Sequence, residues 1–251
     1  MDIIDIEKIT YDYYSHWTGL KMDAQKRGVF LNYYPERDLV PKGYSQSMDV
    51  FVFSTVHLSV VSYGNKAKEK IENIADKLKE NQNIDFLAPL LKEAFSTNVN
   101  RNIKYIYKKR MDSNIKAAIL NACHYELFFA FFTQGWPKNG DTSWVKEYFL
   151  EKSSRNYIHG IIIENKLVSA TDAPDMPYMS NLVQEIGINT LPEYRGKGYA
   201  RSACISLINE LLSKNICPLW STGNDNTASD RLARSTGFEK LADVLSLHAS
   251  G

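Results

Sequence analysis

The sequence of 251 residues has no excess of charge of either sign, few cysteines and no long apolar run. Thirty Lys and Arg residues stand against 29 Asp and Glu residues, and the net charge of +1 gives no overall field that would favour nucleic acid or an anionic membrane. The strongest apolar run, residues 127–132, is far shorter than the roughly 20 residues that span a bilayer. The first residues are acidic and lack the charge pattern of a signal peptide. We therefore expect a cytoplasmic protein that binds neither nucleic acid nor membrane.

The three cysteines, Cys123, Cys204 and Cys217, lie far apart and include no Cys-x-x-Cys pair. This pattern is typical of buried, reduced thiols, and it argues against a disulfide framework or a zinc site. We expect no metal. The Gly-Lys-Ser/Thr ending of a P-loop and the Gly-x-Gly-x-x-Gly fingerprint of dinucleotide-binding proteins are also missing.

A glycine-containing loop, Arg-Gly-Lys-Gly-Tyr-Ala at residues 195–200, stands between a predicted strand and a predicted helix. Residues 182–190 are rich in β-branched and apolar residues, which is typical of a strand, and Pro192 ends it. After the loop, apolar residues recur at i, i+3 and i+4, as on one face of a helix. Free N–H groups in the first turn of that helix, with Arg195 and Lys197, favour an anion such as a phosphate. An ordinary strand-to-helix turn with two solvated cations explains the same residues.

This loop resembles the Arg/Gln-x-x-Gly-x-Gly/Ala pyrophosphate loop of the GCN5-related N-acetyltransferases (GNAT). Further along the chain, five residues match the family's second motif, Asn-x-x-Ala/Ser-x-x-Leu followed by Gly-Phe, at the expected spacing: Asn226, Ser229, Leu232, Gly237 and Phe238. The resemblance covers about residues 112–250, and Pro-Leu-Trp-Ser at 218–221 is similar to a signature of a bacterial branch. Two motifs in the right order are more specific than either alone.

The resemblance implies an α/β fold in which residues 111–251 form an acetyl-CoA-binding GNAT domain. Its central sheet is expected to be mixed and splayed, with helices on its flanks. Residues 1–110 alternate helix and strand patterns and predict a smaller α+β domain, which we expect to resemble a degenerate GNAT unit and to shape the substrate site. This block has no phosphate loop, so we do not expect a second active site. The main elements expected in the chain are helices at 6–21 and 119–132 and strands at 28–34, 49–54, 57–63, 102–108, 157–163, 166–171, 182–190 and 218–222.

The resemblance also implies acetyl-CoA as co-substrate, with its thioester between the parallel strands at 182–190 and 218–222. Loop amides would hold the diphosphate, loop cations would add charge, and backbone groups of the first strand would bond the pantetheine amides like an added strand. Asn226 would contact the pantetheine arm or the thiol region. The expected cofactor-binding residues are Ile188, Thr190, Arg195, Gly196, Lys197, Gly198, Tyr199, Ala200, Asn226 and Ser229.

Glu185 is the candidate catalytic base, because a protonated amine must lose a proton before it attacks. It lies one residue from the position where relatives often have a base, which reverses its face on a regular strand unless a bulge intervenes. His159 and Asp172 are alternatives, and for His159 we favour a satisfied sheet histidine. The family often has a tyrosine as general acid seven residues after the Asn. Ala233 stands there in this chain, so we name no acid.

We expect an N-acetyltransferase that moves an acetyl group from acetyl-CoA to an amine of a small molecule or peptide by direct attack. One alternative is a non-catalytic acyl-CoA-binding or regulatory module. Another is a transferase of a longer acyl or aminoacyl group. The sequence leaves the acceptor open, and it allows a monomer or a homodimer.

Overall fold

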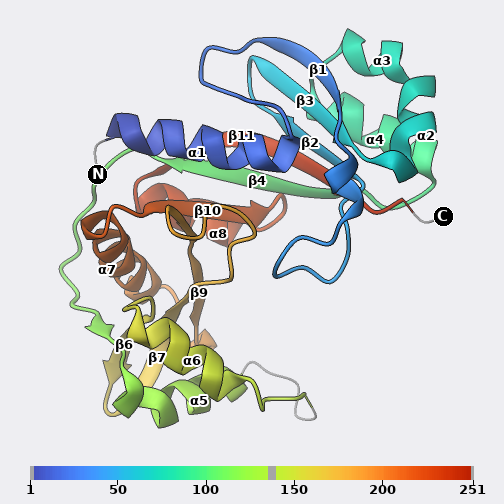
Figure 1. Cartoon of the computed structure of the whole chain (residues 1–251). Coiled ribbons are helices and arrows are strands. Elements are labelled where there is room, and N and C mark those ends of the chain that lie inside the picture. Colours follow the sequence, from blue (N-terminus) through green and yellow to red (C-terminus); the bar gives the residue numbers. More distant parts are fainter. Residues whose placement is uncertain (1–2, 135–139, 250–251) are drawn as a thin grey trace.

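The computed structural model describes residues 3–134 and 140–249, and two β-sheets organise this part of the chain (Figure 1). The strands of the larger sheet, in order across it, are β1 (Gly28–Tyr33), β3 (Leu58–Tyr63), β2 (Val50–Ser54), β11 (Phe238–Leu247), β4 (Asn100–Tyr107), β10 (Cys217–Gly223) and β8 (Val183–Glu185). Those of the smaller sheet are β5 (Ala118–Ile119), β6 (His159–Ile163), β7 (Lys166–Asp172) and β9 (Gly187–Thr190). β1 is parallel to β3 and β10 is parallel to β8, whereas the other paired strands are antiparallel.

Helices cover both sheets (Figure 1). They are α1 (Ile3–Thr18), α2 (Lys68–Asn73), α3 (Ala75–Glu80), α4 (Ile84–Phe95), α5 (Tyr125–Gln134), α6 (Val145–Ser154), α7 (Tyr199–Ser213) and α8 (Thr227–Ser235). Figure 1 shows α1 along one side of the larger sheet, α7 and α8 on the other, and α2 to α4 grouped beyond β1 to β3. One apolar cluster joins α1, the middle of the larger sheet and α7, a second lies under α2 and α4, and a third lies between α5, α6 and the smaller sheet.

The two sheets separate within one stretch of chain, residues 183–190. β8 pairs in parallel with β10, and the last bond of that pairing runs from the Ile186 N–H to the Leu219 carbonyl oxygen (3.0 Å). From Gly187 onward the chain pairs with β7 instead, and β10 continues beside β4. The predicted mixed, splayed sheet flanked by helices is therefore confirmed, and the splay begins at Ile186.

The larger sheet contains strands from both sides of residue 110, where we expect a domain boundary. β4, which precedes that residue, lies between β11 and β10, which both follow it. β11 also pairs with β2. The division into residues 1–110 and 111–251 stays a prediction, and the hydrogen bonding of the larger sheet crosses it.

The helix predicted from residue 119 begins later than expected. Residues 118–119 form β5, whose pairing with β6 continues as a hydrogen bond from the Leu120 N–H to the Ile158 carbonyl oxygen (2.9 Å). A 3₁₀ turn, Ala122–His124, then leads into α5. The predicted start of the helix was wrong because residues 118–119 pair with a strand some 40 positions away, although the spacing of the apolar residues is helical.

Cysteine exposure differs from the expectation at one position. Cys204 and Cys217 are buried, and burial raises the pKa of the Cys217 thiol to about 12. Cys123 is exposed, because it lies in the 3₁₀ turn before α5 and not in a helix face.

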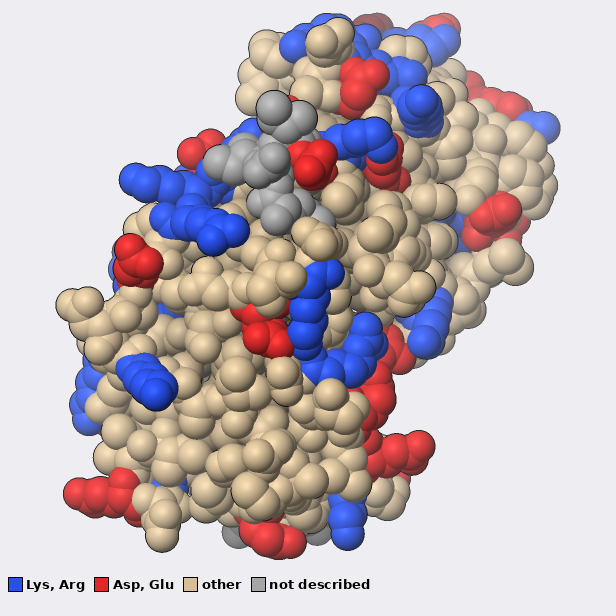
Figure 2. Space-filling model, turned by 60° about the vertical axis from the view of Figure 1, so that its left-hand side comes forward, with Lys and Arg blue, Asp and Glu red and all other residues tan. Residues whose placement is uncertain are grey.

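Two further features of the described residues are the distribution of surface charge and the length of the helices. Figure 2 shows Lys and Arg side chains interspersed with Asp and Glu over one face of the molecule. Within the described ranges, no helix is both long and apolar enough to cross a membrane.

Candidate functional site

The loop at residues 195–200 adopts a conformation that depends on its two glycines. Gly196 and Gly198 have φ angles of +75° and +80°, in the left-handed region where a Cβ is strained. Gly198 is the N-cap residue of α7, and it has no side chain to bond the first turn of that helix. The loop therefore enters the helix without the usual side-chain cap.

The N–H groups of residues 196–201 have no hydrogen-bond partner among the described residues. On either side of them, Arg195 donates its N–H to the Pro192 carbonyl oxygen (3.2 Å), and Ser202 donates its N–H to the Gly198 carbonyl oxygen (3.1 Å). In the described chain, no hydrogen bond uses the N–H groups of residues 196–201, which lie between these two. Free donors at a helix N-terminus, next to exposed arginine and lysine side chains, are suited to an anion.

A cleft of about 700 Å³ lies beside the loop. Its walls are β9, the loop, the first turn of α7, the middle of β10 and the start of α8. Nine of the ten predicted cofactor-binding residues line it: Ile188, Thr190, Arg195, Gly196, Gly198, Tyr199, Ala200, Asn226 and Ser229. Lys197 is the exception, and its Nζ lies over the Tyr194 ring, 5.0 Å from the ring centre. The volume is within the range of about 300–1,000 Å³ that is usual for ligand pockets.

One edge of β9 faces this cleft, because β10 has turned away from it. Leu191 donates its N–H to the Val168 carbonyl oxygen of the β7 segment (2.9 Å). Alternate residues of an antiparallel strand bond to the same neighbour, so the backbone groups of Ile188 and Thr190 point away from β7 and toward the cleft. These are the two positions at which the sequence predicts a strand edge available to a ligand.

Thr190, however, already has partners from its own chain. Its N–H donates to the side-chain oxygen of Asn189 (2.8 Å), and its carbonyl oxygen accepts from Nε of Arg195 (3.1 Å). A ligand that accepts the Thr190 N–H must displace the Asn189 side chain, whereas the carbonyl oxygen keeps a second lone pair beside its bond from Arg195.

Sequence comparison identifies the family to which these features belong. The family model described as GNAT acetyltransferase matches residues 52–243, more than half of the chain. The chain belongs to the GNAT acetyltransferase family. The resemblance drawn from the two motifs is therefore confirmed, and by its family the protein is an acetyltransferase. The match begins within β2, so it includes strands from the N-terminal block of this GNAT protein.

Solved structures share the GNAT fold at low identity. A GNAT acetyltransferase from Colwellia psychrerythraea is 16% identical with a TM-score of 0.54, over 74% of this chain and 75% of that one. A GCN5-related N-acetyltransferase from Sphaerobacter thermophilus is 12% identical with a TM-score of 0.51, over 63% of this chain and 54% of that one. The yncA protein of Salmonella typhimurium, solved with acetyl-CoA, is 16% identical with a TM-score of 0.44, over 55% of this chain and 96% of that one. Comparison with curated proteins gives no match.

The second GNAT motif forms the wall opposite β9. Asn226 is the N-cap of α8, and its side-chain oxygen accepts the N–H of Ser229 (3.0 Å). The Ser229 hydroxyl accepts a hydrogen bond from the indole nitrogen of buried Trp220 (3.1 Å). Both motif residues therefore line the cleft and also hold α8 against β10. Ala233, at the position of the expected tyrosine, is completely buried.

Glu185 does not line the cleft, but it is bonded to a residue that does. The Ser221 hydroxyl, on β10, donates a hydrogen bond to Oε1 of Glu185. The backbone N–H of Glu185 donates to the sulfur of Met176 (3.3 Å), which comes from the segment between β7 and β8. Glu185 is thus held directly before the point at which the sheets separate.

Neither of the two alternative bases lines the cleft. His159 is buried, its Nδ1 lies 2.8 Å from the Ser206 hydroxyl, and its Nε2 lies 2.9 Å from the Asn156 carbonyl oxygen. Burial lowers the pKa of His159, so its neutral form is favoured. Asp172 accepts a hydrogen bond from the Tyr148 hydroxyl and one from the N–H of Ala173 (2.9 Å). These contacts fit the satisfied sheet histidine that we favour for His159, and they give Asp172 one partner from α6 and one from the residue that follows β7.

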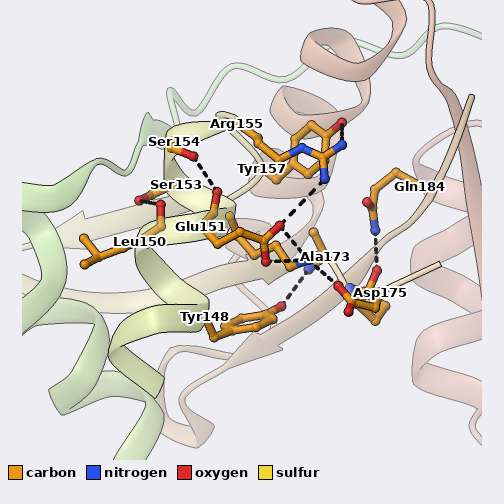
Figure 3. Close-up of polar contacts among 12 residues, drawn as sticks. Tyr148, Leu150, Glu151, Ser153, Ser154, Arg155, Tyr157, Ala173, Asp175 and Gln184 are labelled. Carbon is orange, nitrogen blue, oxygen red and sulfur yellow. Dashed lines mark hydrogen bonds and ion pairs between the residues drawn. The ribbon is translucent and has the colours of Figure 1, made fainter. Parts of the chain in front are cut away.

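A polar network anchors the segment between β7 and β8 that leads to Glu185 (Figure 3). The ammonium group of Lys152 on α6, only 2% exposed, donates to Asp175 (2.6 Å) and contacts Glu151 (3.1 Å). Figure 3 shows the side chains of Glu151 and Asp175 directed toward each other across this point. The hydrogen bond from Lys152 holds the pKa of Asp175 below its usual value. Lys42, from the N-terminal block, also approaches Asp175 (3.6 Å).

Sequence reasoning missed two cleft residues on β10, Trp220 and Ser221. Both belong to the Pro-Leu-Trp-Ser signature that resembles a bacterial GNAT branch. The signature indicated that this strand contributes residues to the site, but it did not indicate what role those residues have.

Proposed function

We propose that this GNAT protein transfers an acetyl group from acetyl-CoA to an amine of a small molecule or peptide, by direct attack of the amine on the thioester. The observation that carries the proposal is the row of N–H groups at residues 196–201 that find no partner in the described part of the chain, beside a cleft of about 700 Å³ that starts where β8 and β10 separate. A diphosphate fits the first feature and an extended pantetheine arm fits the second.

Each part of the cleft then has a separate role. Amides of Gly196, Gly198 and Ala200 hold the diphosphate, and Arg195 and Lys197 supply charge that is not buried. The edge of β9 bonds the pantetheine amides, as an added strand would, and Asn226 contacts the pantetheine arm from α8. No covalent enzyme intermediate is needed, so the protein contributes mainly orientation and electrostatic stabilisation of the reacting carbonyl.

Glu185 is the base that we propose for the amine. It is a half-buried residue on the strand that ends where the sheets separate. The buried Ala233 has no proton to donate to the departing thiolate. A thiolate is a tolerable leaving group, so turnover does not require the missing tyrosine.

Binding of CoA tests the loop. We expect Gly198→Asp to weaken CoA binding by about 100-fold or more, because a carboxylate at the N-terminus of α7 repels phosphate and its Cβ occupies the loop. The measurement is titration calorimetry with CoA. Gly28→Asp is the matched control, since Gly28 also has a positive φ (+104°) but lies on β1 at the far edge of the larger sheet. Normal CoA binding by Gly198→Asp would refute the loop assignment.

Turnover separates the enzyme from the alternatives. Acetyl-CoA is incubated with a panel of amines and basic peptides, and CoA release is followed with a thiol reagent in the Cys123→Ser background, because Cys123 is exposed. Amine-dependent release supports the N-acetyltransferase. Stoichiometric binding without release over hours would support the acyl-CoA-binding module, which the buried Ala233 favours. Faster release from longer acyl-CoA would support the transferase of a larger group.

A further inference from the structure

Among the described residues that line the cleft we assign to acetyl-CoA, there is no Asp, Glu or His side chain that could act as a base. An amine that attacks a thioester at the separated strands must nevertheless lose a proton. A group that connects the cleft to a carboxylate outside it would meet this need.

Ser221 makes this connection because of the strand register. In the parallel pair of β10 and β8, Leu219 lies opposite Glu185. Ser221 is two residues further along β10, so its side chain is on the same face of the sheet as that of Leu219 and Glu185. Its hydroxyl reaches back to Oε1 of Glu185, while the residue itself lines the cleft. The side chain thus bridges the two strands at the point where they begin to separate.

Three tyrosines lie close enough to Glu185 to be affected by its charge. Tyr13 and Tyr14 face it from α1, and Tyr44 faces it from the segment before β2. Burial, followed by the charge of Glu185, raises the pKa of Tyr44 to about 12. Burial likewise raises the pKa of Tyr13 and of Tyr14, with the Glu185 charge as a smaller contribution. All three phenol groups therefore stay protonated at the pH at which an amine is acetylated.

We infer that Ser221 relays the proton of the attacking amine to Glu185. As the amine nitrogen bonds to the acetyl carbon, Ser221 Oγ takes a proton from that nitrogen and passes its own hydroxyl proton to Oε1 of Glu185. The carbon–sulfur bond breaks with its electron pair on sulfur, which is protonated by water. Ser221 is unchanged at the end, and Glu185 returns its proton to solvent. This inference rests on the proposed function and adds a second catalytic residue to it.

The test compares steady-state acetylation by the wild type, Ser221→Ala, Glu185→Gln and the double variant, with acetyl-CoA and the best amine of the panel. We expect Ser221→Ala to lower kcat by about 100-fold, within the usual contribution of a positioned proton acceptor. The double variant should be no slower than Glu185→Gln, because residues that act as one unit are not additive. Ser221→Thr, which keeps the hydroxyl, should restore most of kcat. Ser213→Ala, on the exposed end of α7, is the matched control and should leave kcat unchanged.

Two further readouts distinguish a relay from a structural contact. The affinity for CoA should be the same in Ser221→Ala and the wild type. In mixtures of H₂O and D₂O, the rate of the wild type should fall along a curve, as expected for two protons in flight, and that of Ser221→Ala along a line. Unchanged kcat in Ser221→Ala, or additive losses in the double variant, would overturn the relay and leave the proposed function intact. If the wild type releases no CoA with any amine, the proposed function fails and the relay with it.

Discussion

At the scale of single residues, Arg195 has two competing partners. It contacts the Thr190 carbonyl now, and we propose that it also serves the diphosphate. A charge-assisted contact between Arg195 and the diphosphate contributes about 1.5–3 kcal/mol to the free energy of binding. Loss of the Thr190 contact when CoA binds offsets about 1 kcal/mol of that. We therefore expect Arg195→Ala to weaken CoA binding by about 1–2 kcal/mol, roughly 5- to 30-fold. Calorimetry at low and high salt measures this, and the difference should shrink as salt screens the exposed charge. Lys92→Ala removes the same charge from α4 and should leave affinity unchanged, and equal losses in both variants would contradict the assignment.

His159 makes the stability of the fold depend on pH. Burial lowers its pKa, so the unfolded chain binds a proton more readily than the folded one. The stability that this residue contributes is complete above the unfolded pKa of about 6.5, and it falls as pH drops from there toward the folded pKa. Urea unfolding should show that the free energy of unfolding of the wild type is lower at pH 5.5 than at pH 7.5, and that this difference is smaller in His159→Gln. At pH 7.5 the free energy of unfolding of the variant should also be about 1–3 kcal/mol lower than that of the wild type, because glutamine cannot reproduce the hydrogen bonds of both ring nitrogens. An identical pH slope in the two proteins would exclude His159 as the source.

Single residues were predictable from the sequence where their role is local. The loop glycines and the Asn226 cap lie in short motifs whose geometry is set within a few residues, and all three line the cleft. Ser221 was not predictable, because its bond to Glu185 spans 36 positions and depends on the register of β10 against β8. A sequence shows which residues alternate on one strand, but not which residue lies beside them on the next.

At the scale of elements, the turn from α8 into β11 depends on the glycine of the second motif. Gly237 has a φ of +101°, and a Cβ there would lie 1.9 Å from the Lys109 carbonyl oxygen. The Gly237 carbonyl oxygen also accepts the N–H groups of Lys108 (2.9 Å) and Lys109 (3.2 Å). Gly237→Ala must therefore strain the backbone and push β4 and β11 apart.

Comparison with another glycine isolates that clash. Gly196 also has a positive φ (+75°), but within the described chain a Cβ there would have no other atom within 4 Å. We expect Gly196→Ala to lower the free energy of unfolding by about 1–2 kcal/mol, the cost of the left-handed backbone alone. Gly237→Ala should lose about 2–5 kcal/mol, because overpacking adds to that cost. Urea unfolding curves of the two variants measure the difference. Equal losses of unfolding free energy in the two variants would mean that the chain around Lys109 moves aside at no cost in free energy.

Elements were predicted well where their pattern is regular, and less well where pairing partners change. The strands β1 to β4 and the helix α1 lie within a few residues of their expected positions. β8 and β9 were predicted as one strand, since residues 182–190 form an unbroken β-rich run. In the structure they belong to different sheets, because β10 pairs with the first half and β7 with the second. The exchange of partners at Ile186 is what opens the cleft.

At the scale of the whole molecule, the strands after residue 110 pair with strands that come earlier in the chain. β11 lies between β2 and β4, and β10 lies between β4 and β8. α1 also packs against the core of β10, and its Thr10 hydroxyl lies 3.5 Å from the sulfur of Cys217. The family match extends back to residue 52, which agrees with this arrangement.

The division at residue 110 can be tested by producing residues 111–251 alone. Without β2, β4 and α1, both edges of β11 and one edge of β10 would be unpaired, and their apolar faces would be open to water. We expect a fragment that aggregates and shows no cooperative urea transition, whereas the full chain unfolds cooperatively. Coexpression of residues 1–110 as a separate chain is the control, because pairing of β4 with β10 and β11 across the cut should restore solubility and CoA binding. A soluble fragment 111–251 that unfolds cooperatively and binds CoA would instead establish an independent domain, and β2 and β4 would then serve only to extend its sheet.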